Sequence, residues 1–280
     1  MRAGTFSPNH IGNDAAIFNL TAEALRKRGC SVKVYSEEEF NEAEITEPVI
    51  IAMCRRQNSI EKLKSLEDAG CLVVNSGYGI DNCNRERMTR LLIGNGVPYP
   101  DSLIVNTNEN VKDELIEKDF TQVWIKRGDT TIHREDVSYC RQPDEAQEVL
   151  HEYFYRGIKR AVINRHLTGD LIKFYGVRDT DFFYWYEPMA PATETEEASS
   201  LYEGVSRSEF IETFLKTTCA RISDIMDVRV YGGECIMTAD GTIKIIDFND
   251  WPSFAPCRDK ASVVIAKSIL SLIAQKNGKR

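Results

Sequence analysis

The segment Gly232-Gly-Glu-Cys-Ile-Met-Thr-Ala-Asp-Gly-Thr-Ile-Lys-Ile-Ile-Asp-Phe-Asn249 contains two apolar runs separated by Asp240-Gly241. An Asp-Gly pair between two such runs predicts a β-hairpin with a two-residue turn. With that turn, Glu234 lies opposite Asp247 and Gly232 lies opposite Asn249. Residues that pair directly across two antiparallel strands share one face of the sheet, with Cβ atoms roughly 4.5–5.5 Å apart.

Two carboxylates and an amide therefore come together on one face of the expected hairpin. Facing carboxylates repel each other unless a cation or a proton lies between them. A set made only of oxygen ligands suits Mg²⁺ or Mn²⁺ and does not suit zinc. The pattern predicts a metal site formed by Glu234, Asp247 and Asn249; the alternative is an ordinary hairpin with polar residues at its open end.

The region before residue 77 alternates helix-like and strand-like segments. A helix is expected from about residue 13 to residue 27, and strands are expected at Ser31–Tyr35, Val49–Met53 and Leu72–Val74. This alternation predicts a parallel sheet covered by helices. The segment Gly77–Asn82 has the pattern of a link to a second unit.

Strands dominate the rest of the chain. They are expected at about 102–105, 122–126, 136–140, 161–165, 171–177, 182–186, 229–237 and 242–248. Helices are expected at about 60–69, 85–94, 108–117, 143–155, 207–226 and 258–275, and 190–204 is expected to be a mobile surface loop. We predict an α/β (α+β) protein with an N-terminal αβ domain at 1–76 and further units at 77–167 and 168–280.

Composition narrows the classes of protein. Hydrophobic residues make up 42% and charged residues 28%, as in soluble globular proteins. No apolar stretch is long enough to span a bilayer and no signal-peptide pattern is visible, so we expect a cytoplasmic protein without membrane association. The eight cysteines form no metal-binding spacing, and the net charge of −8 argues against a nucleic-acid partner. A homodimer stays open.

Four segments, in this order, resemble the ATP-grasp superfamily from about Asn75 onward. They are Arg85 to Leu92 followed by Gly96-Val97-Pro98-Tyr99-Pro100, then Val123-Trp124-Ile125-Lys126, then Ala161 to Leu167 followed by Gly169, and the set Glu234, Asp247 and Asn249 with its thirteen-residue separation of the acids. The region before them resembles the domain that usually precedes this fold. The resemblance implies the ATP-grasp fold, with ATP and Mg²⁺ (or Mn²⁺) as cofactors.

The resemblance also implies roles by position. Lys126 would hold the α- and β-phosphates, with Arg85 where many members have a second lysine. Arg165 and Leu167 would contact adenine through their backbones. The two acids would hold the metal against the phosphates, with Asn249 on a second ion.

Several further residues are candidates on their own chemistry. Lys173 lies in an apolar strand, where a lysine needs an anionic partner; that partner is a phosphate or, alternatively, a structural carboxylate. Arg178, just beyond this strand, is a candidate on the substrate side, and we take it with Lys173 as catalytic. Arg55-Arg56 follows a strand at the end where ligands approach an open αβ sheet, so the pair could hold an anionic substrate or lie in a solvated loop. The roles of His133 and His166 stay open.

We therefore expect an ATP-dependent ligase that joins a carboxylate to an amine-type nucleophile through an acyl phosphate. The alternative is an ATP-grasp kinase that phosphorylates a hydroxyl group. A third class is a nucleotide-binding module without catalysis, which would not need two acids and an asparagine. The partner in the first two cases is a small molecule or a peptide, which the sequence does not identify.

Overall fold

The computed structural model describes residues 8–129, 136–189 and 205–278, with side chains from residue 14 on. Its helices are α1 (Pro8–Arg26), α2 (Glu37–Glu42), α3 (Gln57–Asp68), α4 (Gly77–Asn82), α5 (Arg85–Gly94), α6 (Lys112–Glu117), α7 (Pro143–Tyr155), α8 (Arg207–Met226) and α9 (Arg258–Gly278). Its strands are β1 (Val49–Ile51), β2 (Leu72–Val74), β3 (Ser102–Asn106), β4 (Val123–Arg127), β5 (Val137–Cys140), β6 (Arg160–Arg165), β7 (Asp170–Val177), β8 (Phe183–Tyr186), β9 (Val230–Met237) and β10 (Ile243–Asp250). The expected α/β (α+β) class is confirmed.

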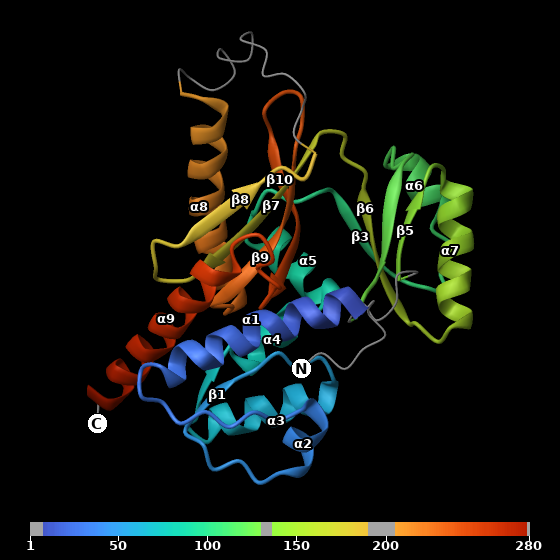
Figure 1. Cartoon of the computed structure of the whole chain (residues 1–280). Coiled ribbons are helices and arrows are strands. Elements are labelled where there is room, and N and C mark those ends of the chain that lie inside the picture. Colours follow the sequence, from blue (N-terminus) through green and yellow to red (C-terminus); the bar gives the residue numbers. More distant parts are fainter. Residues whose placement is uncertain (1–7, 130–135, 190–204, 279–280) are drawn as a thin grey trace.

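The strands form two antiparallel sheets and one small parallel sheet. The central sheet has the order β3-β6-β4-β5, and the C-terminal sheet has the order β10-β9-β7-β8. Figure 1 shows α6 and α7 on the outer side of the central sheet and α8 beside the C-terminal sheet. The short link from β6 to β7 joins the two sheets, and β1 pairs with β2 in the N-terminal region.

Each large sheet buries one face under a helix and leaves the other face partly open. In β4, Val123 and Ile125 are fully buried in the core with α7, whereas Trp124 is 37% exposed. Successive side chains of a strand point to opposite faces, so Lys126 lies on the face of Trp124, away from α7. β7 follows the same rule, because Phe174 packs with α8 while Lys173 is half-buried on the other face.

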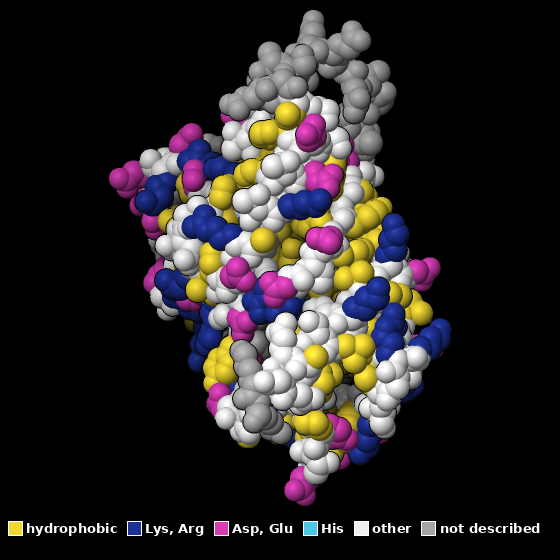
Figure 2. Space-filling view, turned by 90° about the vertical axis from the view of Figure 1, so that its left-hand side faces the viewer, with side chains coloured by type: hydrophobic (Ala, Val, Ile, Leu, Met, Phe, Trp, Pro, Cys, Tyr) yellow, Lys and Arg dark blue, Asp and Glu magenta, His cyan; other side chains and the backbone are white. Residues whose placement is uncertain are grey.

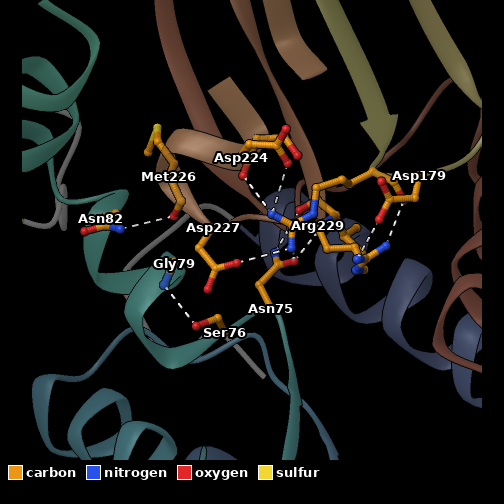
Figure 3. Close-up of polar contacts among 12 residues, drawn as sticks. Asn75, Ser76, Gly79, Asn82, Asp179, Asp224, Met226, Asp227 and Arg229 are labelled. Carbon is orange, nitrogen blue, oxygen red and sulfur yellow. Dashed lines mark hydrogen bonds and ion pairs between the residues drawn. The ribbon is translucent and has the colours of Figure 1, made fainter. Parts of the chain in front are cut away.

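The N-terminal region is attached to the C-terminal sheet by hydrogen bonds as well as by apolar packing. Asn75 is fully buried; its side chain donates to the Val230 carbonyl at 2.8 Å and accepts from the amides of Arg229 and Val230 at 2.9 and 2.7 Å. Asn82 of α4 donates to the carbonyl of Met226 at 3.2 Å (Figure 3). Side chains of α1 and α9 share one buried cluster with Val74, Val230 and Trp251. The two regions are therefore closely docked.

Two expectations about secondary structure differ from the structure, and one helix was not expected. Ser31–Tyr35 is irregular, because a strand needs a hydrogen-bonded neighbour and this segment has none in the described part of the chain. Gly77–Asn82 is not a link but the short helix α4, capped by the Ser76 side chain. Helix α2 was not expected; Ser36 and Glu39 cap it reciprocally. The expected loop at 190–204 lies outside the described residues.

Charge is mixed on the face of the molecule shown in Figure 2. Lysine and arginine side chains alternate there with aspartate and glutamate, and no continuous basic area covers that face. In the ranges that the structure describes, no helix combines the length and apolar character needed to cross a membrane.

Candidate active site

The hairpin of β9 and β10 brings the predicted metal ligands together. Asp247 pairs directly with Glu234, and Asn249 pairs with Gly232, as predicted. The predicted two-residue turn is wrong, however. Thr238 pairs with Thr242 around a three-residue loop in which Gly241 has a φ of 82°, a conformation that suits glycine.

A β-bulge restores the expected register. Ile243 pairs with Met237 and Ile245 with Cys235, one position away from the predicted partners, and the register shifts between Ile245 and Asp247. The extra residue is Ile246. A bulge places two residues of one strand opposite one residue of its partner, so it compensates for the extra residue in the turn. Glu234 and Asp247 consequently face each other through two irregularities that the sequence pattern did not reveal.

A row of polar side chains crosses the C-terminal sheet at this level. Asp247 pairs with Glu234, Glu234 pairs with Lys173 of β7, and Lys173 pairs with Tyr186 of β8. Direct pairing places these four side chains on one face of the sheet, the face opposite α8. Lys173 is therefore brought to the predicted metal ligands.

Two ion pairs neutralise the facing carboxylates. Nη1 of Arg85 lies 2.8 Å from Oδ1 of Asp247, and Nζ of Lys173 lies 2.7 Å from Oε1 of Glu234. Arg85 begins α5, where Asn84 caps the helix by accepting from the amides of Glu86 and Arg87. The positive charges that compensate the two acids are thus side chains of the protein itself.

Lys126 approaches the same site from the central sheet. Its side chain is 9% exposed, and its Nζ donates to the carbonyl oxygen of Ile246, the bulge residue, at 3.2 Å. Burial, together with the nearby charge of Arg85, lowers the pKa of Lys126 from 10.5 to about 8. Burial would raise the pKa of Asp247, but Arg85, Lys126 and a hydrogen bond from Asn249 together hold that pKa below its usual value. Three basic side chains, those of Arg85, Lys126 and Lys173, therefore lie close to the two acids of the hairpin.

The donor set fits a hard divalent cation. Glu234, Asp247 and Asn249 offer only oxygen ligands, as Mg²⁺ prefers. In the described ranges no three residues of the types His, Cys, Asp and Glu cluster as a metal site would require. The site thus has two acids and an amide, which suits a cation that keeps water or phosphate oxygens among its ligands.

Two apolar side chains, Leu171 and Ile236, and the side chain of Lys244 lie on the same sheet face. Leu171 pairs with Ile236, and Ile236 pairs with Lys244, one step along the strands from the row of acids. All three are half-buried. The alternation of Leu171, Lys173 and Tyr175 in β7 was the signal that could have found this surface. A flat apolar surface beside a cationic site suits a base and its phosphates.

The predicted adenine-contacting residues lie where the two sheets meet. Arg165 ends β6, and Leu167 lies in the link that leads to β7. The Arg165 side chain is turned away from the link: it donates to the Lys118 carbonyl at 2.8 Å and lies 4.8 Å from the centre of the Phe120 ring. The backbone amides of Arg165 and His166 donate to the carbonyls of Asp101 and Gln122 at 2.9 and 2.8 Å, so contact of this link with adenine stays a prediction.

Arg178 is not brought together with the other candidates. It follows β7 and contacts the end of α8, with its Nη2 3.2 Å from Oδ1 of Asp227 and its Nη1 3.7 Å from Oδ1 of Asp224. Figure 3 shows these acids beside Asn75 and Arg229, in the region where α4 and α8 meet. We therefore leave Arg178 out of the proposed site.

The remaining candidates have different outcomes. His166 accepts from Nε1 of Trp124 at 3.0 Å, beside the half-exposed ring of Tyr139, which indicates a packing role. His133 lies outside the described residues. Arg55 lines a polar cavity of about 420 Å³ that also reaches Asp247 and Asn249. Arg56 instead pairs with Glu38 at the surface.

Solved ATP-grasp proteins share this arrangement of elements. The ATP-grasp ligase PsnB with a minimal precursor gives a TM-score of 0.60 at 15% identity, over 95% of this chain and 96% of that chain. D-alanyl-alanine synthetase A from Vibrio cholerae gives 0.66 at 12% identity, over 98% and 96%. A RimK domain ATP-grasp protein from Sphaerobacter thermophilus gives 0.67 at 15% identity, over 91% and 95%. No family model and no curated protein sequence matches the chain. The chain has the ATP-grasp fold.

Proposed function

We propose that this protein is an ATP- and Mg²⁺-dependent ligase that joins a carboxylate to an amine-type nucleophile through an acyl phosphate. The proposal is carried by the row of Asp247, Glu234 and Lys173, against which Arg85 and Lys126 also lie. Three cations and two acids in one cleft suit a ligand that brings both phosphates and a divalent cation. The likeness to a ligase and a synthetase of the same fold supports it.

Lys126 and Lys173 are the proposed phosphate-binding residues. Without nucleotide, the buried amine of Lys126 has a neutral carbonyl as its partner, and Lys173 has Glu234. Phosphate oxygens form stronger, charge-assisted hydrogen bonds with a lysine than a carbonyl does. The link around Leu167 and the surface of Leu171 and Ile236 would then hold the base.

Glu234, Asp247 and Asn249 are the proposed ligands of Mg²⁺. When bound, the metal would neutralise negative charge on the transferred phosphoryl group. Arg85 and Lys173 each contact one oxygen of these carboxylates, so the metal would compete with both cations, and their displacement would free them to meet the phosphates. PsnB has been solved with Mg and ADP, which supports the same pair of ligands here.

The reaction that this arrangement supports has two steps. A carboxylate oxygen of the substrate attacks the γ-phosphorus, the bond to the β–γ bridging oxygen breaks, and ADP leaves. The amine then attacks the acyl carbon, phosphate leaves, and the nitrogen releases a proton. The residues of the chain orient the reactants and neutralise charge, and none has to act as a covalent nucleophile.

A screen of amino acids, short peptides and polyols for ADP and phosphate release tests the proposal. A ligase releases ADP and free phosphate together, and only when a carboxylate and an amine are both present. ADP release with a hydroxyl compound, without free phosphate, would instead identify a kinase. No turnover with any compound, despite nucleotide binding, would identify a binding module.

A further inference from the structure

The polar cavity of about 420 Å³ extends from the proposed metal ligands to the N-terminal domain. Asp247, Asn249, Arg55, Gln57 and Ser253 are among the residues that line it. Lys126, Lys173 and the surface of Leu171 and Ile236, the proposed phosphate and base contacts, are not in this lining. This cavity is therefore the place where a molecule that reacts with the γ-phosphate can be held.

The turn after β1 directs one arginine into this cavity and the next one away from it. The amides of Arg55 and Arg56 donate to Oε1 of Glu37 at 2.9 and 2.8 Å, and Glu37 is 2% exposed. The Arg55 side chain, 21% exposed, then lines the cavity. The Arg56 side chain, 41% exposed, pairs with Glu38. The backbones of Arg55 and Arg56 are therefore held by the same carboxylate, whereas their side chains point in different directions. Arg56 can thus serve as the control for Arg55.

In the part of the chain that the structure describes, the Arg55 guanidinium makes one ion pair, with a buried acid. Its Nη1 lies 2.7 Å from Oδ1 of Asp250, which is 1% exposed, and Oδ2 of Asp250 has no hydrogen-bond partner in the described part of the chain. A guanidinium group has five N–H donors in a planar fork and can bind two anions at once. The Asp250 contact is not bidentate, so the fork keeps donors for a second anion.

Two acids of the cavity lining already have cationic partners. Asp81 is paired with Lys64 and Arg87, and Asp129 is paired with Arg127. Arg55 and Arg85 are the only cationic residues among the described lining, and Arg85 is paired with the proposed metal ligand Asp247. Arg55 is therefore the basic residue of this lining that is available to an anion away from the metal ligands.

We propose that Arg55 binds an anionic group at the far end of the carboxylate substrate, so that the substrate is a molecule with two anionic ends, such as a dicarboxylic acid. This inference rests on the proposed function. Arg55 lines the same cavity as the proposed metal ligands Asp247 and Asn249, so one molecule with two anionic ends could meet both.

Calorimetric titration of dicarboxylates from succinate to suberate, with butyrate and hexanoate as single-charge comparisons, tests the proposal. The protein is first saturated with Mg²⁺ and a non-hydrolysable ATP analogue. We expect one range of dicarboxylate lengths to bind and the monocarboxylates to bind at least about tenfold more weakly, as for the loss of one charge-assisted contact. Equal binding of both series would overturn the inference.

Three variants separate an anion-binding role from a structural ion pair. Arg55→Met should weaken dicarboxylate binding roughly tenfold or more, and Arg56→Met should leave it unchanged. Asp250→Asn should tighten it, because Arg55 loses a competing anion; a purely structural pair predicts no such gain. The double variant Arg55→Met with Asp250→Asn removes both charges, so the loss can be measured even where Arg55→Met alone does not fold.

The outcomes distinguish the inference from the function on which it rests. Wild-type protein that binds the nucleotide analogue with Mg²⁺ but no dicarboxylate would refute the role of Arg55 and leave the ligase proposal intact. Failure to bind the analogue itself would contradict the proposed function. Dicarboxylate binding that is unchanged in both Arg55 variants would also refute the inference.

Discussion

Lys126 is the proposed phosphate-binding residue whose protonation we expect a nucleotide to change. It is buried beside Arg85, its partner is only the carbonyl of Ile246, and its pKa is lowered to about 8. Phosphates next to its amine would favour the charged form and raise the pKa again. Binding of nucleotide should therefore be coupled to proton uptake near this pH.

We expect calorimetric titration of a Mg²⁺-bound ATP analogue at pH 8, in buffers of different ionisation enthalpy, to show uptake of roughly half a proton, since a group with a pKa of about 8 is half protonated there. Lys126→Met should abolish the uptake.

The same lysine predicts how stability depends on pH. The pKa of Lys126 in the folded protein lies below the unfolded value of 10.5, so the unfolded state binds more protons between about pH 8 and 10.5. The unfolding free energy should rise across that window in the wild type and lose this rise in Lys126→Met.

The ion pair between Asp247 and Arg85 decides how substitution of Asp247 should affect stability. Facing acids alone would gain stability from the loss of one charge, but here Arg85, which is 11% exposed, depends on Asp247 as its partner. Asp247→Asn should lower the unfolding free energy without ligand by about 1–3 kcal/mol. It should also lower kcat by roughly 100-fold or more, because a metal that stabilises transferred charge contributes several kcal/mol. Asp101→Asn is the control, because Asp101 is a 58% exposed acid, and it should leave kcat unchanged. An unchanged kcat in Asp247→Asn would exclude a metal-ligand role for Asp247.

The pairing of Glu234 with Asp247 in the β9–β10 hairpin was predicted correctly, but the turn on which that prediction rested was wrong. The alternation of apolar residues predicted both strands, and the Asp-Gly pair predicted a turn between them. The actual turn is one residue longer, and the bulge at Ile246 offsets it. A bulge depends on contacts outside the hairpin, here including Lys126 of the central sheet, which donates to the Ile246 carbonyl. No local pattern of residues encodes that contact.

The ion pairs on the hairpin also predict how metal binding depends on nucleotide. Arg85 and Lys173 occupy the two carboxylates, so a divalent cation alone meets a site that already carries positive charge. Mn²⁺, followed by its electron paramagnetic resonance signal, should bind weakly without nucleotide and tightly with ADP. Lys173→Met should strengthen nucleotide-free binding about tenfold, equivalent to about 1.4 kcal/mol.

Lys244→Met is the matched control, because Lys244 lies on the same sheet face but its Nζ is 4.0 Å from Asp101 and not paired with either hairpin acid. Equal Mn²⁺ affinity in the wild type and Lys173→Met would show that the lysine does not compete with the metal.

For the molecule as a whole, docking of the N-terminal region is the part that the sequence predicted least. Asn75 binds the backbone of Arg229 and Val230, more than 150 positions away, and a Cβ atom on Gly79 would lie 2.0 Å from the carbonyl oxygen of Asp227. Helix α4 exists because of this docking, since its Gly-Tyr-Gly start is a poor helix former. Regular alternation revealed the sheets, whereas contacts between distant segments decided how they are assembled.

Gly79→Ala tests this docking. The added methyl group would meet backbone and not a flexible side chain, so α4 and the end of α8 must separate. We expect the unfolding free energy to fall by about 1–3 kcal/mol, as for an overpacked core site, in urea titrations. Gly94→Ala, in α5 with no atom within 4 Å of its added Cβ, should be neutral or stabilising by about 0.5–1 kcal/mol. Equal effects of the two substitutions would argue against close docking.

We propose that ATP binds beside the β9–β10 hairpin through a metal held by Glu234, Asp247 and Asn249. Calorimetric titration of a non-hydrolysable ATP analogue, first with Mg²⁺ and then with EDTA, tests this assignment. We predict binding that is at least about tenfold tighter with Mg²⁺, and that this gain is lost in Asp247→Asn. Equal affinity in Mg²⁺ and in EDTA, or the same gain in the variant, would contradict the assignment of the metal site.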